Sequence, residues 1–281
     1  MDEHVMELLG KARAVVRNGK VVEVSEPKLD YCPLFKKLHG IDRITKEEVL
    51  KNLSYRIENF GLFTANRKIL DDRVFATFGA SEIFFSCLKS GFLDAVVIVA
   101  DCAGTVVTSN PKLVQGLGGR ISGLIKTSPI PEVIERIEKE GGFVVSKTAE
   151  IDQVKGVFFA LEKGFRRIGV TLTTPEEAKA IAEIEKEKGI KILKFAVHTT
   201  GVDWNKADML NFDLITLCAS KSLRENLKGI VKAQVGEAIP IVAVSEFGKL
   251  ALLERAKDLD GILITPKQLP YLSQNQPEPL L

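Results

Sequence analysis

Polar side chains with catalytic potential follow several short apolar stretches of the sequence. Asp101, His198 and Lys221 each come soon after such a stretch. If the stretches are parallel strands, these residues meet at the carboxyl edge of one sheet, where α/β folds bind ligands. We therefore predict them as catalytic candidates, with Asp101 as a general base or a hydrogen-bond anchor. The alternative is that polar residues at strand ends only cap helices, as we expect for Thr174 and Ser222.

A glycine-rich segment follows the most apolar of these stretches, Val96–Ala100. This stretch predicts a strand buried on both faces, because it is short and rich in β-branched residues. The glycines after it would let backbone N–H groups approach an anion, so the segment predicts a ligand-contacting loop. The competing interpretation is a long connection whose glycines only serve turns. The predicted ligand-binding residues are Gly104, Gly118, Gly119, Arg120, Ser122, Gly123 and Lys126, together with Ser220 further along the chain.

The named phosphate-binding motifs do not match this segment. Gly116, Gly118 and Gly119 lie too far after the strand for the dinucleotide fingerprint, and the third glycine is misplaced. The spacing from Gly118 to Gly123 fits half of a P-loop, but Lys126 is shifted by two positions. Anion binding is therefore the most economical prediction, and the sequence identifies no particular anion or cofactor.

The cysteines predict a second, competing kind of site. Cys32 precedes a proline in a loop, and Cys102 and Cys218 end predicted strands. Together with His198 these cysteines could hold a soft metal or an iron–sulfur cluster. Cys102 beside Asp101 could instead act as a thiolate nucleophile. Cysteine is also a common small core residue, as we expect for Cys87 on an apolar helix face.

Composition excludes several broad classes of protein. The formal net charge is +2 and no basic run stands out, so we expect no nucleic-acid partner. The amino terminus is acidic and lacks the apolar region of a signal peptide, and no apolar stretch is long enough to span a bilayer. None of the four cysteines forms a C-x-x-C pair. We therefore expect a cytoplasmic protein without a membrane partner and without a disulfide framework.

Residues 1–72 predict an amino-terminal subdomain. Two β-rich runs around Asn18-Gly19 are typical of a hairpin. Thr45 and Glu48 have the spacing of a capping box, which predicts a helix from about Lys46 to Asn59.

Residues 73–265 predict an α/β domain, and residues 266–281 predict a carboxyl-terminal tail without periodicity. Strands alternate with helices, which favours a mainly parallel sheet with flanking helices, and a (β/α)₈ barrel is the alternative. The predicted strands are Val74–Phe78, Val96–Ala100, Phe143–Val145, Arg167–Leu172, Ile192–Val197, Leu214–Cys218, Ile239–Val244 and Ile262–Ile264.

Four segments together resemble the archaeal family called methanogenesis marker protein 8, a family without an established activity. They are KVVEVSEPKLDYCPLFKKL, DCAGTVVTSNPKLVQGLGGRISGLIKTSPIPEVIE, HTTGVDWNKADML and LCASKSLRE. The resemblance covers nearly the whole chain. It departs from the family's Asp-Gly-Ala-Gly pattern at Asp101-Cys102-Ala103-Gly104, which weakens a metal role for Cys102 and leaves Cys32 and Cys218 as the predicted ligands.

The resemblance implies an accessory factor of methanogenesis. It implies methyl-coenzyme M reductase or its assembly machinery as a partner, besides an anionic small molecule or coenzyme as ligand. Two other functions stay open: an enzyme acting on a phosphorylated or carboxylated metabolite, and a metal or iron–sulfur carrier.

Overall fold

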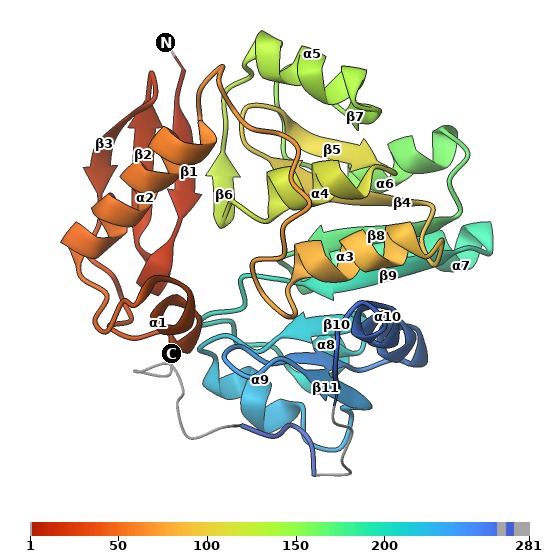
Figure 1. The fold of residues 1–281 in the computed structure, drawn as a ribbon. Helices are drawn as coiled ribbons and strands as arrows, with labels where there is room; N and C mark the ends of the chain where they lie inside the picture. Colours follow the sequence, from red (N-terminus) through yellow and green to blue (C-terminus); the bar gives the residue numbers. More distant parts are fainter. Residues whose placement is uncertain (1, 263–267, 273–281) are drawn as a thin grey trace.

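The strands form two separate sheets in the computed structural model, which describes residues 2–262 and 268–272 (Figure 1). One sheet has four strands and lies in the amino-terminal part of the molecule, and the other has eight strands. The chain is therefore a mixed α/β protein with a small antiparallel unit beside a larger α/β unit. No helix among the described residues is long and apolar enough to cross a bilayer.

The small sheet has the order β3-β2-β1-β6, and its neighbouring strands are antiparallel. The predicted hairpin is confirmed, because Asn18 and Gly19 both adopt the positive φ that a tight hairpin turn requires. The predicted helix at Lys46 is also confirmed, since the Thr45 hydroxyl accepts the backbone N–H of Glu48 at 3.3 Å. The elements of this unit are β1 (His4–Glu7), η1 (Leu9–Lys11), β2 (Arg13–Arg17), β3 (Lys20–Val24), α1 (Pro33–His39), α2 (Lys46–Phe60) and β6 (Gly123–Lys126).

The large sheet has the order β11-β12-β10-β9-β8-β4-β5-β7. Its centre is parallel, from β4 through β8 and β9 to β10, as predicted, whereas the pairs outside the centre are antiparallel. The described sheet is open, with β11 and β7 at its edges, so the barrel alternative is wrong. The strands are β4 (Ala95–Ala100), β5 (Gly104–Thr108), β7 (Gly142–Val144), β8 (Arg167–Leu172), β9 (Lys191–Ala196), β10 (Leu214–Thr216), β11 (Ala233–Val235) and β12 (Ile241–Ala243).

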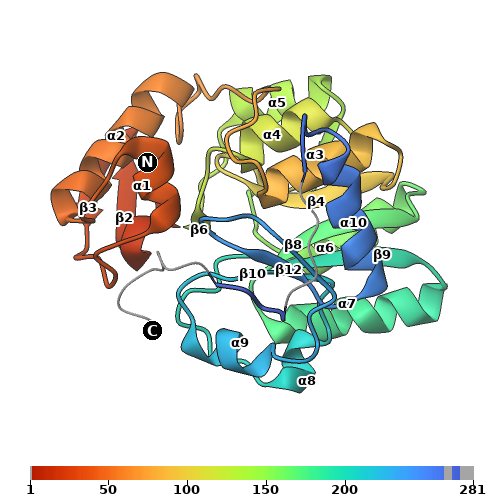
Figure 2. The same cartoon turned by 60° about the horizontal axis from the view of Figure 1, so that its bottom comes forward.

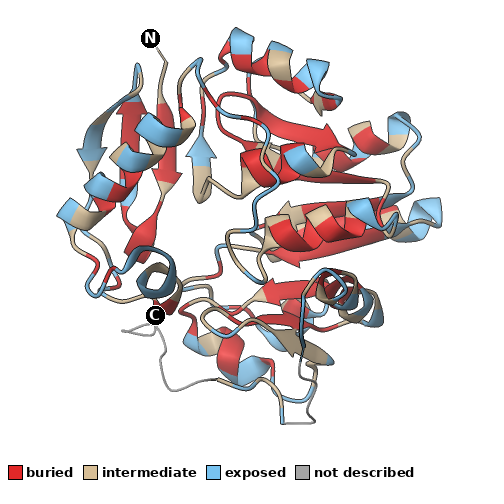
Figure 3. Cartoon of the chain, viewed as in Figure 1, coloured by how far each residue is buried: buried red, intermediate tan, exposed pale blue. Residues whose placement is uncertain are grey.

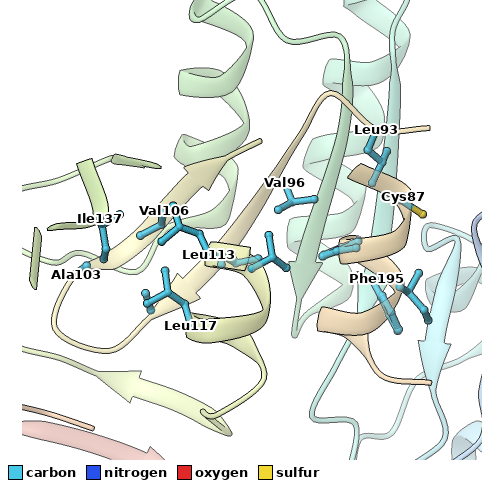
Figure 4. Packing of buried hydrophobic residues seen from close by; sticks show 14 of the residues in the cluster. Cys87, Leu93, Val96, Ala103, Val106, Leu113, Leu117, Ile137 and Phe195 are labelled. Carbon is cyan, nitrogen blue, oxygen red and sulfur yellow. The ribbon is translucent and has the colours of Figure 1, made fainter. Parts of the chain in front are cut away.

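Helices cover both faces of the large sheet, and each face has its own apolar core (Figures 2 and 3). The central strands are apolar on both faces because both faces are covered, which is the pattern that the sequence showed. The first face carries α3 (Ala80–Lys89), α4 (Pro111–Gly118), α5 (Pro131–Lys139) and α10 (Glu246–Ala256). Its packing is drawn in Figure 4, where Cys87 of α3 lies on the side of Val96 and Phe195, and Ile137 of α5 lies on the side of Val106. The second face carries α6 (Gln153–Glu162), α7 (Pro175–Lys188), α8 (Lys206–Met209) and α9 (Lys221–Asn226).

Several predictions about elements need correction. The glycine-rich segment after β4 is not an irregular loop, because it folds into β5, α4 and β6. Val74–Phe78 forms turns and bends instead of a strand. The helix α9 begins after Ser220, two residues earlier than the predicted capping box at Ser222. The predicted strand Ile262–Ile264 and most of the tail fall outside the described residues.

The amino-terminal unit also takes a strand from later in the chain. β6 pairs with β1 through Leu124 and Met6, so the four-stranded sheet combines the first residues with a segment that follows α4. The glycine-rich segment therefore runs from the carboxyl edge of the large sheet into the small sheet and lies beside the space between the two units.

Candidate functional site

A cleft lies between the two units, with a cavity volume of about 1040 Å³. One wall is the carboxyl edge of the large sheet, represented by Thr173 after β8, His198 after β9 and Cys218 after β10. The opposite wall comes from α1, α2 and β6 of the amino-terminal unit. The site therefore occupies the edge that parallel strands of α/β folds present to ligands.

Two arginines meet at one end of this cleft. Arg56 of α2 donates from Nη1 to the Arg120 carbonyl at 3.3 Å and to the Ser122 hydroxyl at 3.0 Å. Among the described residues, no carboxylate lies within ion-pair distance of Arg56. Burial and the charge of Arg120 lower the pKa of Arg56 to about 10, so Arg56 remains charged at neutral pH. This end of the cleft carries excess positive charge.

Aromatic rings fix the guanidinium of Arg120. Its Cζ atom lies 3.8 Å from the ring centre of Phe60 and 3.1 Å from that of Phe75. Nη2 donates to the Asp71 carboxylate at 3.1 Å, and Nε is buried without a hydrogen-bond partner among the described residues. The two rings cover the faces of the Arg120 guanidinium. A hydrogen-bond acceptor can therefore approach only along the edge that carries the N–H groups.

His39 at the end of α1 is a third basic side chain at this end of the cleft. Burial first, and then the charges of Arg56 and Arg120, lower the pKa of its imidazole below the usual range. Its ring stacks on Phe35, with 5.7 Å between the ring centres. An anion placed among these three side chains would relieve the repulsion between them.

His198 lies on the opposite wall in a backbone conformation that L residues rarely adopt, with φ of 57°. Such strain is concentrated at functional sites. The imidazole faces the space of the cleft, and desolvation by the surrounding protein lowers its pKa to about 4, so the ring is neutral at pH 7. A Cβ added at Gly123 of β6 would lie 3.6 Å from Cγ of His198 and 3.3 Å from Cβ of Glu7. The glycine therefore lets the small sheet come close to His198.

Cys32 and Cys218 line the same cleft from opposite walls. Burial raises the pKa of both thiols, and the charge of Cys32 further raises that of Cys218. Among the residues that the structure describes, no group of three or more His, Cys, Asp or Glu side chains has the arrangement of a metal site. The metal role of the two cysteines stays a prediction.

Sequence comparison identifies the family. A family model described as "Uncharacterized protein conserved in archaea (DUF2099)" matches residues 4–257. The chain belongs to this archaeal family. It is 58% identical over 282 residues to "Uncharacterized protein MJ0054" of Methanocaldococcus jannaschii, and the match covers all of both chains. Neither description names an activity, so the chemistry of this DUF2099 protein has to be inferred from its own cleft.

The structure brings most of the predicted ligand-binding residues to this cleft. They come from the end of α4, the start of β6 and the residues between, and two further predicted residues, His198 and Cys218, reach the cavity from strand ends. The predicted residues that line the cavity are Gly118, Gly119, Arg120, Ser122, Gly123, His198, Cys32 and Cys218.

Asp101 lies outside the cavity and is engaged in a buried ion pair. Its carboxylate accepts the Arg67 Nε–H at 2.8 and 3.1 Å and the backbone N–H of Phe63 at 2.9 Å. Both charged side chains are fully buried. The observed arrangement is that of an anchor that holds the segment after α2 against the end of β4.

The other predicted residues outside the cavity have local structural contacts or are exposed. Gly104, at φ of 73°, turns the chain between β4 and β5, where an added Cβ would meet the Ala149 backbone at 2.4 Å. Lys126 pairs with Glu3 at 2.9 Å. The Ser220 hydroxyl caps α9 by accepting the Leu223 N–H at 3.2 Å, and Lys221 is exposed at the first position of that helix.

Apart from Cys32 and the residues at β6, sequence reasoning did not find what the amino-terminal unit contributes to the cleft. Arg56 lies on the helix that the capping box predicted, but nothing in that signal marked the residue, and His39 ends a short helix that was not predicted. Glu7 and Lys11 come from β1 and η1. No local signal in these segments shows that they face the large sheet, because that contact depends on how the two units pack.

Proposed function

We propose that this protein binds an anionic small molecule or coenzyme in the cleft between its two units. The observation that carries the proposal is the pair Arg56 and Arg120, which face one cavity. Among the described residues, Asp71 pairs with Arg120 and no carboxylate pairs with Arg56. The remaining positive charge is partly withdrawn from water, and a ligand anion would supply the missing acceptor.

The geometry favours a group with several acceptor oxygens, such as a phosphate, sulfonate or carboxylate. Arg56 and the Ser122 hydroxyl already share a hydrogen bond, and the edge of Arg120 lies next to them. Gly118 and Gly119 beside Arg120 line the same cavity, but the Gly119 N–H already donates to the Gln115 carbonyl at 3.1 Å. Oxygens that bind here would receive hydrogen bonds from guanidinium and hydroxyl groups together.

Calorimetry with sodium pyrophosphate and sodium sulfate tests this proposal. We expect Arg56→Gln to weaken binding by roughly ten- to a hundredfold, because a hydrogen bond to a charged group contributes about 1.5–3 kcal/mol. The matched control is Arg43→Gln, which removes the same charge at an exposed position outside the cleft. Equal affinity of Arg56→Gln and the wild type, or no binding of either anion, would contradict the proposal.

The biological role that we propose is that of an accessory factor of methanogenesis. The support is the resemblance of the YCPLF and glycine-rich segments to the methanogenesis marker family, and the glycine-rich segment forms part of the cleft wall. The proposed partner is methyl-coenzyme M reductase or its assembly machinery. Deletion of the gene in an archaeon that carries it should lower reductase activity, and unchanged growth and activity would count against this role.

A second candidate function is an enzyme that acts on a phosphorylated or carboxylated metabolite. His198 supports it, since a neutral imidazole in a strained conformation faces the proposed anion site across the cleft. Asp101 and Lys221 take no part, because neither lines the cavity. Mass spectrometry of a metabolite extract incubated with the wild type and with His198→Gln tests the idea, which fails if both proteins deplete the same compounds.

A further inference from the structure

A carboxylate of the amino-terminal unit faces the cleft from the end of β1. Met6 and Leu8, on either side of Glu7, pack into the apolar core of that unit. Because side chains alternate along a strand, Glu7 points away from this core, to the opposite face of the small sheet. It is partly buried there and lines the cavity. Glu7 therefore belongs to the cleft and not to the core of its own unit.

The Glu7 carboxylate has no hydrogen-bond or ion-pair partner in the part of the chain that the structure describes. Lys11 and Lys28 act on its charge only from beyond ion-pair distance. Nζ of Lys11 donates instead to the Thr200 carbonyl at 2.7 Å, and Lys28 is exposed. Both oxygens of Glu7 are therefore available to accept hydrogen bonds from a ligand.

The other carboxylates that line the cavity are already satisfied. Glu82 accepts from Gln115 Nε2 at 3.0 Å. Glu177 accepts from the Thr174 hydroxyl at 2.9 Å, and Glu237 pairs with Lys37 at 3.4 Å. These three carboxylates serve the fold, whereas no contact among the described residues accounts for Glu7.

Gly123 of β6 keeps space open in front of Glu7. The two residues are direct partners in the antiparallel pair of β1 and β6, which lie side by side in Figure 1. A Cβ added at Gly123 would lie 3.3 Å from Cβ of Glu7 and 3.6 Å from Cγ of His198. Glu7 and His198 therefore approach the same point from opposite walls of the cleft, and the glycine places no side chain between them.

The proposed anion site begins at the preceding residue. The Ser122 hydroxyl accepts from Nη1 of Arg56 at 3.0 Å, and Ser122 directly precedes Gly123. Consecutive Cα atoms lie about 3.8 Å apart, so Arg56 and Glu7 flank neighbouring positions of one backbone segment. All four residues line the same cavity. One small molecule can therefore contact the cation and the carboxylate together.

We propose that Glu7 forms an amine subsite, so that the cleft takes an amphoteric ligand with its anionic group at Arg56 and Arg120 and a primary amine at Glu7. This inference rests on the proposed anion site and adds the class of ligand that the site takes. An ammonium group carries three N–H donors and a positive charge. It would supply the Glu7 carboxylate with the charge-assisted hydrogen bonds that the described residues do not provide.

Calorimetry on the full-length protein with matched probes tests the subsite. The probes are 2-aminoethyl, 3-aminopropyl and 6-aminohexyl phosphate, each compared with the alkyl phosphate of the same chain length. A cleft that is only cationic would bind the amines more weakly, because the ammonium group repels arginine. With the subsite, at least one amine should bind roughly three- to thirtyfold more tightly than its matched alkyl phosphate.

Variants separate the amine subsite from the anion site. Glu7→Gln should bring the two probes of each pair to equal affinity, whereas Arg56→Gln should weaken both and keep their ratio. Glu7→Asp keeps the charge one methylene further back, so the preference should remain and move to longer probes. The control Glu23→Gln removes a carboxylate from an exposed position of β3 and should keep the wild-type ratio. Circular dichroism confirms that each variant is folded.

Two kinds of result overturn the proposal. If the alkyl phosphates bind but no amine is preferred, or if the preference survives in Glu7→Gln, the amine subsite is wrong and the anion site stands. Tighter binding of 3-hydroxypropyl phosphate than of 3-aminopropyl phosphate would assign Glu7 to a hydroxyl group and also exclude the amine. If no probe binds at all, the anion site is wrong and the amine subsite falls with it.

Discussion

The Asp101 carboxylate and the Arg67 guanidinium are withdrawn completely from solvent, and each is satisfied by its neighbours. Arg67 also donates to the carbonyls of Lys68, Gly116 and Leu117. Removing only the negative charge would leave a buried cation without its partner. We therefore expect Asp101→Asn to lower the free energy of unfolding by about 3–5 kcal/mol, measured by urea denaturation.

The control for this substitution is Asp42→Asn, which removes a carboxylate from an exposed pair with Lys36. It should lower the free energy of unfolding by less than about 1 kcal/mol. If Asp101→Asn were as stable as the wild type, Asp101 would not be a structural anchor. The predicted catalytic role would then be the remaining explanation for this carboxylate.

The ionisation of His39 predicts how anion binding depends on pH. Burial first, and then the charges of Arg56 and Arg120, lower the pKa of His39 in the free protein, and a bound anion would offset those charges and raise the pKa. Binding then takes up a proton, so sulfate affinity should increase as the pH falls from about 7 to about 5. Calorimetry of the wild type and His39→Gln checks this, because sulfate keeps its charge over that range. An equally steep pH dependence in both proteins would exclude His39 as the cause.

At the level of residues, the sequence predicted part of each wall of the cleft. Glycine-rich composition and strand-end position led to Arg120, Ser122, Gly123 and His198, since both signals are local. The same reasoning placed Asp101 in the predicted site. A carboxylate at a strand end has the same sequence signal whether it faces a ligand or a buried arginine. Arg67 lies 34 positions earlier in the sequence, and nothing local to it indicates burial.

Helix α4 shows how a single element is fitted to its surroundings. A Cβ at Gly116 would lie 2.1 Å from the Ile69 carbonyl oxygen, whereas one at Gly118 would have only Ser81 Cβ nearby, at 3.7 Å. Alanine normally stabilises a helix by about 1 kcal/mol relative to glycine. We expect Gly116→Ala to lower the melting temperature despite this preference, and Gly118→Ala to keep or raise it, as measured by calorimetry. The same effect of both substitutions would show that the backbone contact at Ile69 does not limit α4.

The elements between β4 and α5 were the hardest to predict. Four glycines between positions 116 and 123 suppress both the helical and the strand pattern. Nevertheless, Asn110 caps α4 through the Lys112 N–H, and Pro111 occupies its first turn. β6 is only four residues long and is stabilised by pairing with β1, more than a hundred residues away. Elements that depend on distant partners leave little trace in local periodicity.

For the whole molecule, the sequence predicted alternation of strands and helices but not the direction of every strand. The parallel centre follows from helical crossovers such as α7 between β8 and β9. β5 returns directly from β4 through a tight turn, which only an antiparallel pair allows, and β12 runs antiparallel to β10. The resulting open sheet has a free carboxyl edge, against which the amino-terminal unit forms the cleft.

The contact between Lys11 and Thr200 should control how firmly the two units hold together. Lys11 adopts φ of 63°, a strained backbone conformation for a residue other than glycine. From this position its Nζ donates to the Thr200 carbonyl of the large unit. Replacing it with methionine keeps the apolar stem and removes the donor. In hydrogen exchange, Lys11→Met should speed exchange of α1 and of the segment after β9, while β8 and β4 in the core keep their protection. The control Lys20→Met lies in the exposed hairpin and should change neither region. If Lys11→Met left α1 as protected as in the wild type, the contact with Thr200 would not be what holds the two units together.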